Sequence, residues 1–160
     1  GQKDKGVDGM NYTVETVADS LSNYLKLFLP GFSFYQDPNQ QGTKIPCMFL
    51  QQRYSNIKLE TGGYYLRTIG LDLTCLEEYN LPDLQRRYQK TAEILDLHME
   101  TFPYTDGIQT EPVQIRTYDR EWDIDLNELH YRFEIRERVR IPKETIKMQT
   151  IEKYNEEVVE

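Results

Sequence analysis

Apolar and polar residues alternate along residues 129–141, and this pattern carries most of what the sequence says about the fold. The apolar positions are Leu129, Tyr131, Phe133, Ile135, Val139 and Ile141, and only Glu137 breaks their series. Successive side chains of a strand point to opposite faces, so the run predicts one long strand with one dry face. The wet face carries His130, Glu134 and four arginines: Arg132, Arg136, Arg138 and Arg140.

Further strands are predicted upstream of this run. Residues 65–76 are predicted as a strand, and Gly70 within them permits a bend or close packing. The apolar face of that strand carries Ile69, Leu71, Leu73 and Cys75, and the other face carries Thr68, Asp72 and Thr74. Strands are also predicted at 32–35, at 45–54 and at 111–122. The polar segments 36–44, 55–63 and 123–127 are predicted as loops or turns, the second being a hairpin tip.

Two segments have helical periodicity. The first begins with Thr13 as a capping residue and is expected to end at Pro30-Gly31. Its apolar stripe is Val14, Val17, Leu21, Tyr24, Leu25 and Phe28. The second is expected to be capped by Asn80, with Pro82 near its first turn. Its stripe is Leu84, Tyr88, Ala92, Leu95 and Met99.

These elements predict an α+β fold. Strands joined by short turns are antiparallel, and two amphipathic helices are enough to cover one face of a sheet. We therefore expect a two-layer sandwich of a mainly antiparallel sheet of four or five strands, with both helices on one face. The other face is partly charged, as residues 129–141 show, and a half-covered sheet of this kind often completes its burial in an oligomer.

One domain is expected, over residues 10–141. Residues 1–9 are polar and rich in Gly, Lys and Asp, and are expected to be a remnant of an expression tag or a disordered arm. Residues 142–160 form a polar, acidic extension with sparse apolar positions: Ile146, Met148, Ile151, Tyr154 and Val158. This extension is predicted to be a short helix or an arm, either mobile or docked on a neighbour.

The overall composition narrows the classes of function. The net charge of −8 argues against non-specific binding to nucleic acid, which needs a basic surface. Twelve tyrosines fit either half-buried interfaces or strands, which also favour tyrosine. Cys47 and Cys75 lie in apolar runs and are expected to be buried free thiols. No apolar stretch reaches the length of a membrane span.

The residues give no positive sign of catalysis. His98 and His130 lack neighbours at metal-ligand spacing, and neither cysteine has the surroundings of an activated thiol. Glycine-rich phosphate loops and nucleophile elbows are missing from the sequence. The acidic pairs Glu77-Glu78 and Asp123-x-Asp125 are typical of solvated turns. We therefore expect a protein without enzymatic activity, metal or cofactor.

The four arginines of residues 129–141 have two interpretations. They could lie on a solvated face and form cross-strand ion pairs with Glu77, Asp72 or Asp119, each contributing about 0–1 kcal/mol. They could instead form a docking face for an acidic partner or a neighbouring subunit. We favour the second interpretation, because the adjacent C-terminal extension is acidic and could lie on that face within one chain or between chains.

The chain resembles a known family in its element order and in several short strings. These are the helix ending Leu29-Pro30-Gly31-Phe32, the strand Ile45-Pro46-Cys47-Met48-Phe49-Leu50, Tyr65-Leu66-Arg67 after a Gly-rich hairpin, the strand 69–74, the helix 84–99 and Leu129-His130-Tyr131-Arg132-Phe133. Over most of residues 10–141 it is similar to the small tail terminator (tail completion) proteins of phages, prophages and phage tail-like particles.

The resemblance implies a structural role in a virion or tail-like particle assembled in the bacterial cytoplasm. Such proteins form a sixfold ring on the last ring of the tail tube, end tube polymerisation, engage the sheath in contractile tails and offer a surface to neck or head-joining proteins. A ring needs two different matching patches on each subunit. The expected subunit contact comprises Arg132, Arg136, Arg138, Arg140, Met148, Ile151 and Tyr154. The expected contact with tube or sheath comprises Gln40, Gln41, Lys44, Asn56 and Lys58.

Three alternatives stay open at this point. Another neck component, such as a head–tail joining protein, has similar size and assembly logic. A small cytosolic ligand-binding α+β domain would need a deep pocket with converging polar groups. Binding of nucleic acid through the arginine strand is disfavoured by the acidic net charge and by the lack of a mixed aromatic and basic recognition motif.

Overall fold

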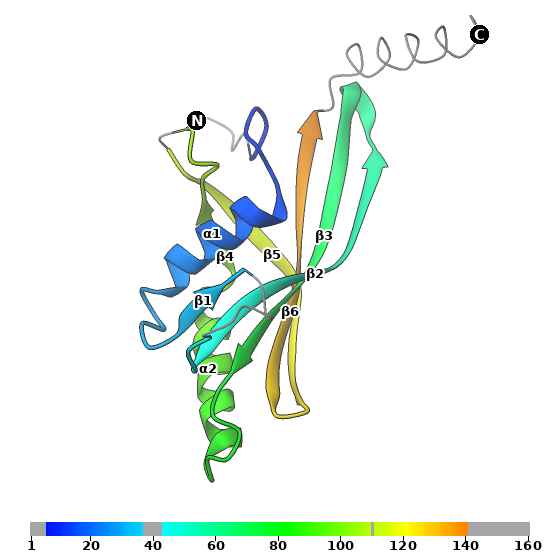
Figure 1. Cartoon of the computed structure of the whole chain (residues 1–160). Coiled ribbons are helices and arrows are strands. Elements are labelled where there is room, and N and C mark those ends of the chain that lie inside the picture. Colours follow the sequence, from blue (N-terminus) through cyan, green and yellow to red (C-terminus); the bar gives the residue numbers. More distant parts are fainter. Residues whose placement is uncertain (1–5, 37–42, 110, 141–160) are drawn as a thin grey trace, which may run out of the picture.

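The computed structural model describes residues 6–36, 43–109 and 111–140. That part of the chain folds into two α-helices, a short 3-10 turn and six strands of one sheet (Figure 1). In chain order the elements are α1 (Val14–Leu25), β1 (Ser33–Tyr35), β2 (Cys47–Leu59), η1 (Thr61–Gly63), β3 (Tyr64–Leu76), α2 (Leu84–His98), β4 (Thr101–Tyr104), β5 (Val113–Asp125) and β6 (Glu128–Arg140).

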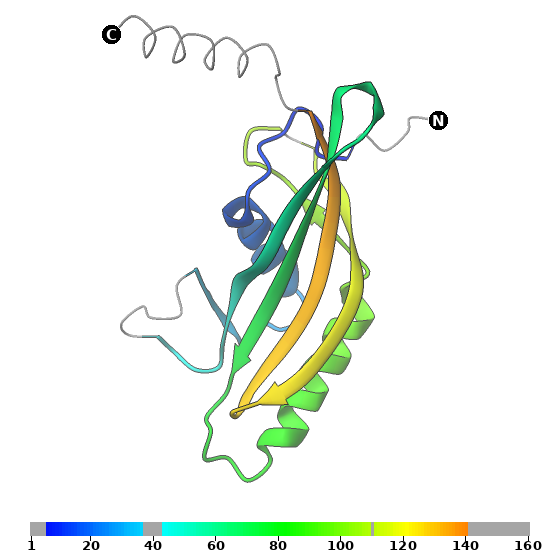
Figure 2. The same ribbon diagram turned by 90° about the vertical axis from the view of Figure 1, so that its right-hand side faces the viewer.

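The sheet has the strand order β1-β2-β3-β6-β5-β4. β1 runs parallel to β2, and the other neighbouring pairs are antiparallel. The sheet is curled like half of a barrel, and both helices lie on its concave side (Figure 2). The α+β class and the placement of the helices are therefore confirmed. The prediction of a sandwich with four or five strands is wrong in detail, because the described sheet has six strands and curls around the helices.

The core lies between the helices and the inner, concave face of the sheet. The predicted stripe of α2 is buried along its length, and α1 buries Val17, Leu21 and Leu25. From β6, the alternate residues Leu129, Tyr131, Phe133 and Ile135 reach the same core. The alternation seen in the sequence therefore corresponds to the dry face of β6, as predicted.

Both helix boundaries differ from the prediction at one end. Thr13 caps α1 as expected, through a capping box with Thr16, but the helix ends at Leu25 instead of continuing to Phe28. Asn80 does not cap α2, which begins at Leu84 after Asp83. The reason is Pro82: a residue that precedes proline is disfavoured in helical conformation, so a helix capped by Asn80 would force Leu81 into a crowded geometry.

The sequence also missed one strand and shortened two others. β4 is a four-residue edge strand that contains Pro103, and such a short strand gives no alternation to detect. β5 continues to Asp125, where Leu126 and Asn127, with φ of 50° and 62°, turn the chain into β6. β2 continues to Leu59, so the predicted loop at 55–63 is wrong for its first five residues.

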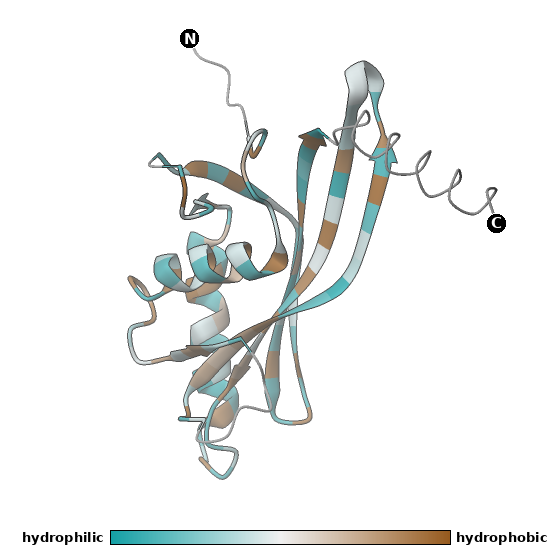
Figure 3. Ribbon diagram, turned by 45° about the horizontal axis from the view of Figure 1, so that its top comes forward, coloured by the Kyte–Doolittle hydropathy of each residue, from teal (hydrophilic) through white to brown (hydrophobic). Residues whose placement is uncertain are grey.

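The extra length of β2 creates a hairpin that extends beyond the helices (Figure 1). We call this the projecting hairpin: residues 51–59 of β2, the tip 60–63 and residues 64–67 of β3. Every residue of its β2 arm is exposed, whereas Cys47, Met48 and Phe49 at the other end of β2 are buried. Apolar and polar residues are mixed along the hairpin (Figure 3), so it has no core of its own. Pairing with β3 holds it in place.

Candidate functional site: the outer sheet face and the projecting hairpin

The wet face of β6 is the outer, convex face of the sheet, and its arginines have partners within the subunit. Arg132 contacts Asp123 at 3.1 Å and Asp72 at 3.5 Å. Arg136 contacts Asp119 and Glu134, each at 3.0 Å, and its guanidinium lies 4.3 Å from the centre of the Tyr118 ring.

The remaining two arginines lie beside the projecting hairpin. Arg138 contacts Glu60 at the hairpin tip at 2.9 Å, and 69% of its side chain stays exposed. Arg140 donates to the hydroxyl of Tyr64 and lies 4.7 Å from the centre of that ring. Acidic partners of β6 were therefore predicted correctly in Asp72 and Asp119. The third predicted partner, Glu77, instead accepts hydrogen bonds from Arg87.

His130 belongs to a hydrogen-bonded cluster on the same outer face. Its Nδ1 lies 2.9 Å from Asp72, and its Nε2 lies 3.1 Å from Glu128. The hydroxyl of Thr74 donates to the other oxygen of Asp72 at 3.1 Å. Both ring nitrogens of His130 face a carboxylate, and Nδ1 also lies 3.4 Å from the hydroxyl of Thr74. This geometry supports a structural role for His130, as predicted from its position on a strand.

A contact between Tyr54 and Gly70 fixes the base of the projecting hairpin, and only the glycine inside the strand pointed to it in the sequence. The ring of Tyr54 lies directly over Gly70, where any side chain would collide with it. Its hydroxyl donates to Glu134 across the sheet. This hydrogen bond, helped by Arg136, holds the pKa of Glu134 below its usual value. Gly70 is therefore explained by close packing, one of the two possibilities that a glycine inside a strand offers.

The projecting hairpin exposes large apolar side chains and unpaired cations. Tyr54, Ile57 and Leu59 are 38%, 52% and 61% exposed. Arg53 and Lys58 form no ion pair with a residue that the structure describes, in contrast to Arg132, Arg136 and Arg138 of β6. The guanidinium of Arg53 lies 5.6 Å from the centre of the Tyr54 ring.

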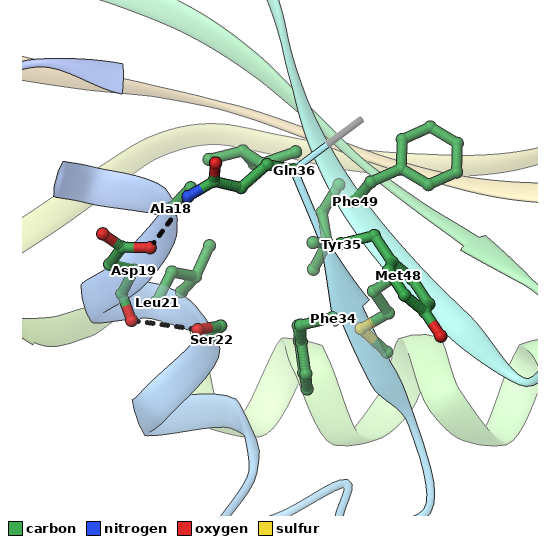
Figure 4. A pocket seen from close by; sticks show the side chains of 11 residues that line it. Ala18, Asp19, Leu21, Ser22, Phe34, Tyr35, Gln36, Met48 and Phe49 are labelled. Atoms are coloured by element: carbon green, nitrogen blue, oxygen red, sulfur yellow. Dashed lines mark hydrogen bonds between the residues drawn. The ribbon is translucent and has the colours of Figure 1, made fainter. Parts of the chain in front are cut away.

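A small pocket lies between α1 and the first two strands (Figure 4). Leu21, Phe34 and Met48 are among the side chains that line it, and its volume is about 160 Å³. Asp19 at its rim already accepts a hydrogen bond from Gln36 at 3.2 Å. Ligand sites usually measure roughly 300–1,000 Å³ and have converging polar groups, so this pocket gives no support to a ligand-binding function.

Of the residues predicted to touch tube or sheath, the three that the structure describes do not lie together. Lys44 precedes β2, where its backbone N–H donates to the hydroxyl of Tyr35 at 2.9 Å. Asn56 and Lys58 lie near the far end of β2, in a strand and not in a loop. Lys58 comes eleven positions after Cys47 along the strand, which corresponds to roughly 35 Å. Gln40, Gln41, Met148, Ile151 and Tyr154 lie outside the described residues.

A comparison with known families decides where the protein belongs. The sequence model of a family described as "Phage tail terminator protein" matches residues 16–147, from α1 to beyond the end of β6. The chain belongs to the phage tail terminator protein family. The resemblance seen in the sequence is thereby confirmed. No curated protein matches the chain.

Membership of the tail terminator family makes the protein a structural component of a phage tail particle that works with other tail components. Neither described helix of this terminator is long and apolar enough to cross a membrane. Within 6–36, 43–109 and 111–140, no group of three or more His, Cys, Asp and Glu residues is arranged so that it could hold a metal ion. Cys47 and Cys75 are both buried, and burial raises the pKa of each thiol.

Proposed function

We propose that this terminator forms a ring of six copies on the last ring of the tail tube and thereby ends tube polymerisation. The opposite surface of the ring is offered to a neck or head-joining protein, and in a contractile tail the ring also engages the last ring of sheath. The observation that carries this proposal is the family match over residues 16–147, together with a subunit surface that is unfinished at the projecting hairpin.

The shape of a single subunit supports a closed ring over a symmetric dimer. A ring requires two different patches that match each other on adjacent copies. The projecting hairpin, with its exposed Ile57 and Leu59, is one such patch. The rest of the outer face, where acidic and basic side chains alternate, is different in character. Two unlike surfaces of this kind favour head-to-tail contacts.

We assign the subunit contact to the hairpin end of the sheet. Arg138 and Arg140 lie there and are exposed, so they can reach acidic groups of a neighbour. Arg132 and Arg136 form ion pairs with acidic residues of their own subunit. We therefore assign them to the structure of the outer face and not to direct contact with a neighbour. Met148, Ile151 and Tyr154 of the C-terminal extension supply apolar side chains for the same boundary.

The tube contact is assigned to the other end of β2, at Gln40, Gln41 and Lys44. Lys44 precedes β2, and Lys58 lies roughly 35 Å from Cys47 along that strand, so Lys44 cannot share one small contact with Asn56 and Lys58. We therefore place Asn56 and Lys58 at the boundary between subunits or against sheath. The two ends of β2 would then serve two different neighbours.

Tube polymerisation in the presence of the terminator tests this function. Purified tube protein is allowed to polymerise with and without the full-length chain, and tube lengths are measured by electron microscopy. We expect shorter tubes with a ring-shaped cap at one end. Unchanged lengths and bare ends would contradict the proposal. Capping without any effect on growth would instead favour another neck component.

A further inference from the structure

The outer edge of β2 lacks a neighbour along most of its length. β1 pairs only with Cys47, Met48 and Phe49, so the described part of the chain leaves the edge open from Leu50 onward. A bulge at Arg53 interrupts this edge, and Tyr54–Leu59 above it pairs regularly with β3 on its other side. Long exposed edges with apolar side chains tend to pair with another strand, and native proteins usually cover them.

We propose that Tyr54–Leu59 accepts residues 145–151 of a neighbouring copy as an added strand. The inference rests on the proposed ring and names the contact that closes it. In this mode of recognition, backbone hydrogen bonds along the edge provide affinity and alternate side chains provide specificity. Each copy donates its C-terminal segment to one neighbour and accepts the segment of the other, so the contact is heterologous.

The sequence of the donated segment suits a strand. Residues 145–151 read Thr-Ile-Lys-Met-Gln-Thr-Ile, in which polar residues flank Ile146 and Met148. In a strand these two side chains lie on one face. On β2, Ile57 and Leu59 also share one face, because they lie opposite Arg67 and Tyr65 in the register with β3. The donated strand would therefore place two apolar side chains beside two exposed ones.

The position and length of the extension allow it to reach a neighbour. Arg140, the last residue of β6, lies opposite Tyr64 next to the hairpin tip. The twenty residues that follow it therefore start at the projecting end of the molecule. Residues 141–144 connect Arg140 to the donated segment and, fully extended, would span at most roughly 18 Å, so the accepting edge must lie close to the hairpin tip of the donor.

Charge favours the same pairing. The β2 strand contains Arg53 and Lys58 but no acidic residue. The extension after Ile151 carries four acids, namely Glu152, Glu156, Glu157 and Glu160, against the single cation Lys153. Opposite charges across an interface accelerate encounter and select the correct partner. The positively charged side chains of the β2 edge are therefore complementary to the glutamates that follow the donated strand.

Site-specific cross-linking between two full-length variants tests the inference. Ile57→Cys and Met148→Cys are prepared separately, mixed under ring-forming conditions and treated with a short bismaleimide. We expect a covalent dimer that contains one chain of each kind. Leu126→Cys replaces Ile57→Cys in the control, because Leu126 is 86% exposed at the opposite end of the sheet; that mixture should give no dimer.

The outcomes separate the inference from the function on which it rests. Normal rings without the Ile57–Met148 cross-link would overturn the strand donation and leave the ring intact. A chain carrying both substitutions that cross-links only within itself would show that the segment folds back on its own subunit. A wild-type protein that never forms rings would instead contradict the proposed function.

A pair of substitutions on the donor gives an independent readout. Ile146→Ser together with Met148→Ser should weaken ring assembly at least about tenfold, since two apolar side chains lose their burial. Their fold should stay intact, as judged by circular dichroism. Assembly equal to that of the wild type would count against the proposed strand.

Discussion

Tyr54, Gly70 and Glu134 show how three residues from three strands fix the start of the projecting hairpin. The Tyr54 ring fills the space that a side chain at position 70 would occupy, and its hydroxyl reaches Glu134 on β6. An aromatic ring that covers a glycine across a sheet also pins the register of the strands. The hairpin beyond this point has little burial, so its orientation depends on this contact.

Replacement of Gly70 tests that dependence. Gly70→Ala should lower the free energy of unfolding by about 1–3 kcal/mol, because the new Cβ collides with the Tyr54 ring and forces it away. Urea denaturation measures the change. Gly31→Ala is the matched control, since a Cβ at Gly31 meets no atom within 4 Å. Equal stability of the two variants would contradict the proposed packing.

The same contact predicts a dependence on acid. The pKa of Glu134 is lowered in the folded protein, first by the hydrogen bond from Tyr54 and then by Arg136. The unfolded chain therefore takes up this proton at a higher pH than the folded one does. The stabilisation is complete above the usual value of 4.5 and is lost as the pH falls through the lower folded pKa.

Glu134→Gln should consequently flatten the loss of stability on acidification. Unfolding by urea at a series of pH values from neutral down to about 3.5 compares the variant with the wild type. Glu93→Gln, at an exposed position on α2, serves as the control and should keep the wild-type slope. A wild-type slope in Glu134→Gln as well would show that this carboxylate is not stabilised in the folded state.

Among the helices and strands, hydrophobic periodicity predicted the elements with one buried face. It missed the part of β2 that is a strand only because it pairs with β3. The stripe of α2 and the dry face of β6 were predicted correctly because both faces meet the core. The far half of β2 is exposed on both faces, so nothing selects apolar residues there at alternate positions. Its strand conformation comes from the register with β3, which a sequence does not display.

The candidate site was predicted unevenly for the same reason. The arginines of β6 were found from their alternation, and Asp72 and Asp119 were anticipated among their partners. The partners Glu60 and Asp123 were not anticipated. A glycine inside a strand indicated possible close packing at Gly70, but nothing in the sequence indicated that Tyr54 is the residue packed against it. Ion pairs and ring contacts of this kind depend on tertiary register, which becomes visible only in the structure.

The N-terminus of α1 offers a test at the level of one element. The hydroxyl of Thr13 accepts from the backbone N–H of Thr16 at 3.1 Å, and the Thr16 hydroxyl accepts from the backbone N–H of Thr13 at 3.1 Å. Thr13→Ala should lower the free energy of unfolding by about 1 kcal/mol. Thr13→Ser keeps the hydroxyl and should stay within about 0.5 kcal/mol of the wild type. Similar losses in both variants would mean that the cap is not the cause.

For the whole molecule, we expect different residues to determine the folding of the subunit and the assembly of the ring. Ile57 and Leu59 are more than half exposed, so their replacement should leave the isolated subunit almost unchanged, within about 0.5 kcal/mol. Ile57→Ser with Leu59→Ser should nevertheless weaken the ring, as measured by sedimentation. Leu97→Ser, on an exposed part of α2, is the control and should assemble normally. Ring stability equal to the wild type would remove the hairpin from the interface.

Charge reversal is best placed at Arg138 and Arg140. Reversal of Arg136 would put a third carboxylate beside Asp119 and Glu134, which are each 3.0 Å away, and would damage the subunit itself. Arg138→Glu with Arg140→Glu changes exposed groups. It replaces one ion pair, that of Arg138 with Glu60 at the hairpin tip, by two like charges, and it should weaken assembly while the core of the subunit stays folded. Rings of normal stability in this variant would exclude the arginine end of β6 from the subunit contact.

The mass of the assembled particle distinguishes a ring of six copies from a single subunit. Size-exclusion chromatography with light scattering, over a range of concentrations and with or without tube protein, reports how many copies associate. We predict a particle of six times the 19.1 kDa chain mass, formed alone or on addition of tube protein. A species of one chain mass under every condition, with no binding to tube protein, would contradict the account.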